Sequence, residues 1–235
     1  FTADGGTIKL DGNYPVGTKN VALGDTALDA VQSGAENNIA VGASALSSVT
    51  TGNDNTAVGN FSLASTTGSQ NTGVGQQALR FNTSGQYNTA QGYRALFSNT
   101  TASNNTAVGY QAVYSNTTGI ANVGLGAYAL QLNTTGNYNT ALGYNAGNAI
   151  TTGNYNIAIG ANALDVSTTA NSNIGIGINA LGSTTTGAEN VAMGLNALLT
   201  NTTGASNVGI GTYALNSNTT AAANTAVGYQ ALTTN

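Results

Sequence analysis

The stretch Asn105-Thr-Ala-Val-Gly-Tyr-Gln-Ala-Val113 recurs almost unchanged as Asn224-Thr-Ala-Val-Gly-Tyr-Gln-Ala-Leu232. A looser form of this unit, Asn-x-Ala/Gly-apolar-Gly-x-x-Ala-Leu, occurs thirteen times along the 235 residues. From Gly75 onward the motif glycine returns every 17 residues, whereas the first three intervals are 18, 17 and 16. Self-similarity at a fixed period is typical of a solenoid, in which each repeat is one coil.

Numbering the positions of each coil from its first Asn gives the consensus N-x-A-h-G-x-x-A-L-x-x-N-T-T-G-x-x, where h is apolar. Side chains alternate along a strand, so positions 2 and 4 share one face, and positions 3 and 5, always Ala or Gly, share the other. A face kept this small indicates that another backbone approaches it closely. The glycines at positions 5 and 15 predict turns that need a positive φ or leave no room for a Cβ. Which face points inward stays open, and it decides between a self-contained coil and a homotrimer whose other chains cover the apolar row of position 4.

Seventeen residues are too few for most helical repeats, which need roughly 33 or more. Stacked short β-coils, by contrast, bury together what one coil cannot bury alone. We therefore predict an all-β parallel β-solenoid (β-roll or β-helix) of about thirteen 17-residue coils over residues 20–235. Residues 1–19 do not fit the repeat, and we expect them to form an N-terminal cap or an inter-subunit docking segment, with a strand near Thr7-Ile-Lys-Leu10.

Composition excludes most catalytic chemistry. The chain has no His and no Cys, which removes the Ser-His-Asp and Cys-His systems and the usual zinc sites. After Asp54 the only acids are Asp165 and Glu189, so paired carboxylates are not expected. Four basic residues cannot neutralise a run of phosphates, and no apolar run reaches the ~18 residues of a membrane span. We expect no enzyme, no cofactor, no nucleic-acid partner and no membrane span.

Stacking turns each coil position into a row of side chains, and several rows could carry a function. The Asn row at position 1 predicts an amide ladder. Asn-Thr-Thr/Ser at position 12 forms N-glycosylation acceptors on one side of the coils, although the same sequence is also good turn chemistry. The candidate acceptors in this row are Asn82, Asn99, Asn116, Asn133, Asn201 and Asn218, and Asn60 and Asn104 are acceptors at other positions.

Two further rows give weaker hypotheses. The Thr-Thr pairs suggest an ice-binding protein, but adjacent side chains at a turn diverge, whereas an ice-matching array needs them parallel. Tyrosines recur at position 6 and could present aromatic surface to glycans, or form a mixed surface row. A dedicated binding site should appear as one exposed position whose residues do not follow the variation that the rest of the repeat allows. No exposed row shows such a pattern.

The Asn-x-Ala-Val/Ile-Gly-x-x-Ala core resembles the head repeats of trimeric autotransporter adhesins, whose coils form left-handed β-rolls. The fuller unit Asn-Thr-Ala-Val-Gly-Tyr-Gln-Ala-Leu is similar to repeats in phage and virus tail-fibre-type proteins. The resemblance covers roughly residues 20–235, and it implies an extracellular, cell-surface or virion rod that displays or binds something.

These observations together predict a structural subunit of an extracellular fibre or stalk that assembles by stacking of its coils. Its expected partners are further copies of itself, in a head-to-tail filament or a homotrimer, and covalent or bound glycans. The alternatives are an adhesin or tail-fibre shaft that binds surface glycans, and an ice-binding protein. The candidate assembly ends are Phe1, Ile8, Leu10, Val227 and Leu232.

Overall fold

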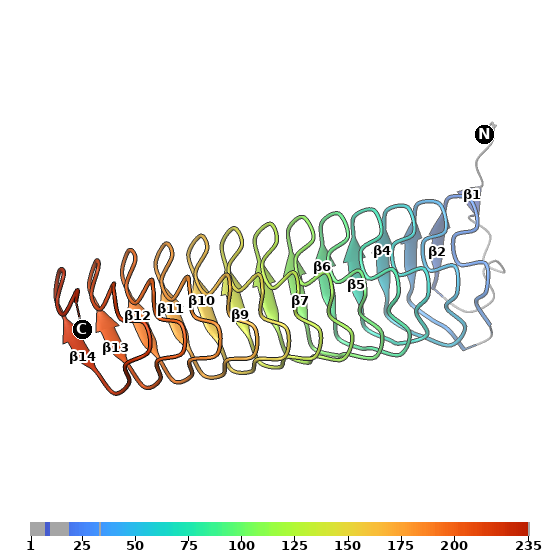
Figure 1. Ribbon diagram of the computed structural model, residues 1–235. Helices are drawn as coiled ribbons and strands as arrows, with labels where there is room; N and C mark the ends of the chain where they lie inside the picture. The colour runs from blue at the N-terminus through green and yellow to red at the C-terminus, as the bar shows by residue number, and fades with distance from the viewer. Residues whose placement is uncertain (1–7, 10–18, 33, 235) are drawn as a thin grey trace. The chain divides into compact units, whose positions relative to one another are not determined.

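The computed structural model describes residues 8–9, 19–32 and 34–234. It contains two compact units, Phe1–Thr118 and Gly119–Asn235, each of which is a parallel β-solenoid (Figure 1). The two units share one coil design but are described separately. The predicted all-β parallel solenoid with a coil of about 17 residues is thereby confirmed.

From residue 21 onward each coil of the first unit contributes one three-residue strand, and successive strands within the unit pair in parallel. Strand neighbours follow chain order, and equivalent coil positions face each other, as in Thr89↔Thr106 and Ala90↔Ala107. The strands are β1 (Ile8–Lys9), β2 (Val21–Leu23), β3 (Ile39–Val41), β4 (Thr56–Val58), β5 (Thr72–Val74), β6 (Thr89–Gln91) and β7 (Thr106–Val108).

The second unit repeats this arrangement with a constant 17-residue offset between paired residues, for example Ile157↔Ile174. Its strands are β8 (Val123–Leu125), β9 (Thr140–Leu142), β10 (Ile157–Ile159), β11 (Ile174–Ile176), β12 (Val191–Met193), β13 (Val208–Ile210) and β14 (Thr225–Val227). The rest of each coil is turn and bend, held by backbone hydrogen bonds to the next coil rather than by long strands.

The small face of each strand points inward, which answers the question that the sequence left open. Position 3 is buried in every strand from β2 to β14, whereas positions 2 and 4 are half-buried or exposed. The apolar side chains of positions 2 and 4 therefore form the outer surface of the sheet. Small residues line the inner face because the opposite wall of the coil lies close behind it.

Leucine at position 9 supplies the bulk of the core. Leu96 is fully buried, its backbone N–H donates to the Ala112 carbonyl of the next coil at 3.0 Å, and its φ is +50°. A left-handed backbone costs a residue with a Cβ about 1 to 2 kcal/mol. Burying a leucine side chain contributes about 1.5 to 3 kcal/mol, so packing offsets the strain.

One coil fills its core with different residues at positions 9 and 12. Gly147 stands at position 9, where the other coils of the second unit carry Leu, and a Cβ on it would lie 3.0 Å from the Cδ1 of Ile150. Ile150 is buried at position 12, where Asn is common, and its side chain fills the space of the missing leucine. The two departures from the consensus therefore compensate each other.

The N-terminal edge of the first unit is paired with β1, which runs antiparallel to β2 with Ile8 opposite Leu23 and Lys9 opposite Ala22. The strand expected near Thr7-Ile-Lys-Leu10 is confirmed for its two central residues, while Thr7 and Leu10 lie outside the described residues. That residues 1–19 act as a cap or as a docking segment stays a prediction.

Candidate functional site

An asparagine ladder lies inside each unit at position 1. In the first unit the Oδ1 of Asn38 accepts from the backbone N–H of Asn55 at 3.0 Å and from its Nδ2 at 3.1 Å. The same Nδ2 also donates to the Gly68 carbonyl across the coil at 2.9 Å. In the second unit Asn207 bonds in the same way to Asn190 and to the Ala221 carbonyl. The amide satisfies both of its functions inside the coil, which makes this row structural.

A second, interrupted ladder occupies position 12. Asn99 donates through Nδ2 to the Oδ1 of Asn82 at 2.7 Å and to the Ala102 carbonyl at 3.0 Å, and Asn116 donates to the Oδ1 of Asn99 at 2.9 Å. In the second unit Ile150, Ser167 and Thr184 take this position. The buried hydroxyls of Ser167 and Thr184 have no hydrogen-bond partner among the described residues.

The glycosylation hypothesis is wrong for the position 12 row, because all six acceptor side chains are fully buried. The Nδ2 atom that would carry a glycan points into the coil, where a sugar has no space, and in Asn201 it donates to the Gly204 carbonyl at 2.9 Å. The excluded acceptors are Asn82, Asn99, Asn116, Asn133, Asn201 and Asn218. Asn60 is half-buried and Asn104 is exposed, so glycosylation of these two stays a prediction.

The two threonines of the Thr-Thr turn differ in their surroundings. The first Thr of the pair donates its hydroxyl to the next coil, as Thr83 does to the Thr100 carbonyl at 2.9 Å and Thr151 does to the Thr168 carbonyl at 3.0 Å. The second Thr of the pair, such as Thr101 or Thr152, is exposed. In these pairs the first hydroxyl is engaged between coils and only the second is left for an outward array, and this geometry does not favour the ice-binding alternative.

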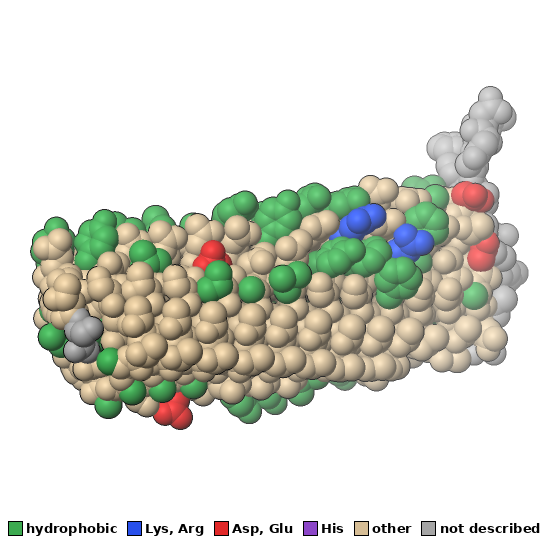
Figure 2. All heavy atoms as spheres, viewed as in Figure 1, with side chains coloured by type: hydrophobic (Ala, Val, Ile, Leu, Met, Phe, Trp, Pro, Cys, Tyr) green, Lys and Arg blue, Asp and Glu red, His purple; other side chains and the backbone are tan. Residues whose placement is uncertain are grey.

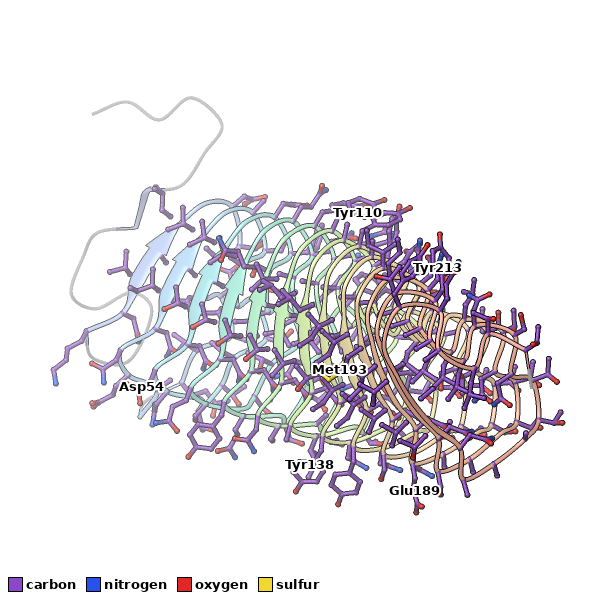
Figure 3. The ribbon with its side chains drawn as sticks, turned by 90° about the vertical axis from the view of Figure 1, so that its left-hand side faces the viewer. Asp54, Tyr110, Tyr138, Glu189, Met193 and Tyr213 are labelled. Carbon is purple, nitrogen blue, oxygen red and sulfur yellow. The ribbon has the colours of Figure 1, made fainter. Side chains whose placement is uncertain are left out.

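The outer face of the sheet is a continuous surface of uncharged side chains. In the second unit the outward positions of β10 and β11 are all isoleucine, namely Ile157, Ile159, Ile174 and Ile176. Leu125, Leu142, Met193 and Ile210 continue the position 4 row and are exposed. Figure 3 shows Met193 on this strand face, whereas Tyr138 and Glu189 project from an edge of the coils. None of the outward positions of β2 to β14 is charged.

A second surface, the arginine–aromatic ridge, lies on the turns of the first unit, outside the strands. Both arginines of the chain stand here among aromatic rings, and Figure 2 shows basic side chains set between hydrophobic ones on this face. The ridge consists of Phe61, Arg80, Phe81, Tyr93, Arg94, Phe97, Tyr110 and Tyr114, which come from positions 6, 7, 10 and 11 of four successive coils.

The ridge was missed in the sequence because its residues belong to several rows, none of which is aromatic throughout. A local count would have found it. Both arginines and three of the four phenylalanines lie between residues 61 and 97. Of the tyrosines predicted at position 6, Tyr93 and Tyr110 stack with ring centroids 5.4 Å apart within the ridge.

The remaining ionisable groups do not gather into a site. Among the described residues no three acids lie close enough together to hold a metal ion. Asp165 is half-buried at a turn, and desolvation raises the pKa of its carboxyl, while a backbone hydrogen bond acts in the opposite direction. Glu189 accepts a hydrogen bond from the Ser206 hydroxyl at 3.2 Å on the outer edge.

The candidate assembly ends are only partly visible. Val227 and Leu232 are exposed in the last described coil, whereas Leu215, which occupies the position of Leu232 one coil earlier, is fully buried. Ile8 pairs through its backbone in β1, and Phe1 and Leu10 lie outside the described residues. Their role in assembly stays a prediction.

In the described part of the chain no helix is long and apolar enough to cross a membrane. Comparison with protein-family models, with curated proteins and with solved structures gives no match.

Proposed function

We propose that this chain is a structural, fibre- or stalk-forming module that associates with further copies of itself through the outer face of its parallel sheet. The observation that carries the proposal is the outward row of uncharged, mostly apolar side chains at positions 2 and 4 of β2 to β14. A contiguous exposed apolar surface on a folded domain is typical of an interface.

A second copy is the partner whose spacing matches this face. Parallel strands recur about every 4.8 Å, so the outward side chains form ridges with that period. A partner packs along the whole face only if its own side chains recur with the same period, and another copy of this chain provides that match. Dry packing of identical strand faces is the geometry of a steric zipper.

The sparse charge of the chain supports self-association, because charged residues are only 5% of the sequence and mutual repulsion is weak. The ladders inside the coils serve the fold and leave the outer surface for function. The resemblance to adhesin head repeats and tail-fibre-type repeats adds the expected setting, a cell surface or a virion, and a non-catalytic role.

Analytical ultracentrifugation of the whole chain over a range of concentrations tests the proposal. The unmodified chain should sediment as a dimer, trimer or larger assembly. The double variant Ile159→Lys/Ile176→Lys places two charges on the face and should shift the population to monomer, because burying an unpaired lysine is costly.

The matched control is Ile178→Lys, which makes the same change at position 6, on an exposed turn outside the strands. It should leave the sedimentation pattern unchanged. An unmodified chain that stays monomeric at every concentration would overturn the proposal. Equal association of the double variant and the control would show that the strand face is not the interface.

A further inference from the structure

We infer that the arginine–aromatic ridge of the first unit is a binding site for an acidic oligosaccharide, with the two guanidinium groups as receptors for sugar carboxylates. This site lies on the turns and is independent of the association proposed for the strand face.

The ridge is one connected series of rings and cations. The Arg80 guanidinium lies 4.6 Å from the ring centroid of Phe61 and 5.3 Å from that of Phe81. The Phe81 and Phe97 rings meet edge to face at 4.9 Å. Arg94 in turn lies 5.0 Å from the ring centroid of Tyr93 and 5.2 Å from that of Phe97. Cation–π contact with these rings stabilises the position of each guanidinium in the ridge.

The two cations have no acidic partner within the described part of the chain. Neither Arg80 nor Arg94 makes an ion pair with any described residue, since the acids of the described chain lie elsewhere, the nearest in sequence being Asp54. Arg94 donates its Nε to the Oε1 of Gln77 at 2.6 Å, which orients the guanidinium and leaves its terminal nitrogens without a hydrogen bond among the described residues. A guanidinium presents paired donors that match a carboxylate in a bidentate arrangement.

The neighbouring rings give this anion site its preference for a sugar. Phe97 and Tyr114 stack almost parallel, 2° apart with centroids at 5.0 Å, and Phe81 and Tyr110 are exposed. Aromatic rings offer apolar faces to the C–H side of a pyranose, while the tyrosine hydroxyls and nearby glutamine amides offer hydrogen bonds to its hydroxyls. The rings recur along successive coils, so the surface suits a chain of sugar units rather than a single small anion.

The positive charges of the chain are concentrated at the ridge, as expected of a specific anion site. Two of the four basic residues of the whole chain stand in adjacent coils of this ridge. The rings of the second unit form pairs without a cation, as Tyr138 and Tyr155 do at 5.2 Å. The second unit therefore provides an internal reference for aromatic surface without positive charge.

Isothermal titration calorimetry of the whole chain with tetragalacturonic acid tests the inference, with its methyl ester as the neutral probe and polyglutamate as a non-sugar anion. The acid should bind at low salt, and binding should weaken as sodium chloride screens the charges. The double variant Arg80→Gln/Arg94→Gln should lower the affinity by about tenfold or more, because it removes the charged donors. Arg94→Lys should give an intermediate loss, since it keeps the charge but not the paired donors.

Tyr155→Ala, on the stacked pair of the second unit, is the matched control and should leave binding unchanged. The strand-face variant Ile159→Lys/Ile176→Lys should also bind as the unmodified chain does, which separates this test from that of self-association. Absent binding of the acid, equal binding of the methyl ester, or equal binding of polyglutamate would each overturn the inference. So would unchanged binding in the double arginine variant with an unchanged circular dichroism spectrum.

Discussion

At the scale of single residues, the interior of each coil combines leucine with asparagine. Leu96 contributes apolar burial, and Asn99, three positions later, contributes amide bonds between coils. Both side chains are fully buried. The amides are tolerated inside because nearly every polar atom finds a partner, and a buried polar group without one costs about 1 to 3 kcal/mol.

Asn99→Ala should lower the free energy of unfolding by about 3 kcal/mol, because it removes three buried hydrogen bonds of about 1 kcal/mol each, namely those from its Nδ2 to the Oδ1 of Asn82 and to the Ala102 carbonyl and the one that its Oδ1 accepts from Asn116. Denaturant unfolding combined with amide hydrogen exchange over residues 82–116 would measure the loss. The comparison variant is Thr184→Val, because the buried hydroxyl of Thr184 has no hydrogen-bond partner among the residues that the structure describes. It should leave stability unchanged or raise it by about 1 kcal/mol. A larger loss in Thr184→Val than in Asn99→Ala would contradict the role given to the ladder.

At the scale of the element, the strand and the turn that closes it depend on glycine at position 5. Gly92 follows β6 with a φ of +135°, and a Cβ there would lie 2.4 Å from the carbonyl oxygen of Gly109 in the next coil. The glycine is therefore required for two reasons, its backbone conformation and the approach of the neighbouring turn.

Gly92→Ala should destabilise the coils around β6 far more than Gly34→Ala. Gly34 also has a positive φ, +106°, but a Cβ there meets nothing within 4 Å, so it isolates the conformational cost. Gly34→Ala should cost about 1 kcal/mol, whereas the steric clash at Gly92 adds a displacement of the neighbouring coil. Thermal unfolding of the two variants would compare them, and equal losses would show that the close approach has no energetic weight.

The repeat made the strands predictable, while their surroundings were harder to foresee. Alternation in Asn-Thr-Ala-Val-Gly correctly placed positions 2 and 4 on one face. Stacking of equivalent coils predicted that the strands pair in a parallel sheet. Local preference could not show that Leu96 and Arg94 take a left-handed backbone, because that conformation normally favours glycine, and packing overrides the preference here. The sequence also suggested acceptor asparagines at position 12, whose side chains are buried even though the second Thr of the turn is exposed, because a sequon does not indicate which way its asparagine points.

The candidate sites were predictable to different degrees. The strand face follows from the repeat itself, once its outward direction is known. The ridge depends on where Arg80 reaches in space, across the preceding coil to Phe61, and no spacing rule within a single repeat reports that contact.

At the scale of the whole molecule, the coil is the unit of construction. Each coil bonds to the coil before it and the coil after it, as Thr140 does to Ile157 and Ile157 does to Ile174. Stability in such an architecture is a sum over coils and their interfaces. Departures such as Gly147 and Ile150 are absorbed inside a single coil, so the neighbours keep their register.

Removing one complete coil should therefore leave a folded protein. Deletion of residues 156–172 joins Tyr155 to Asn173 and brings position 1 directly after position 17. The shortened chain should keep its circular dichroism spectrum and unfold cooperatively. Deletion of residues 156–163 removes half a coil and should abolish the ordered structure of the second unit, because residues 164–172 then remain between β9 and β11 without the strand and the Asn156 amide that complete their coil. Equal behaviour of the two deletions would contradict a coil-by-coil construction.

The position 1 ladder also affects which asparagines are open to slow chemical hydrolysis. Hydrolysis of a side-chain amide turns asparagine into aspartate, and asparagine is among the residues most prone to such thermal damage. At Asn104, which is exposed, the new carboxylate would be solvated. At Asn55 it would be buried against the Gly68 carbonyl that now accepts from the amide, with a negative charge where a donor is needed. The hydrogen bonds that hold the amide in place also restrain the side chain from the rearrangement that hydrolysis requires. The ladder therefore protects from hydrolysis those asparagines whose conversion to aspartate would destabilise the fold most.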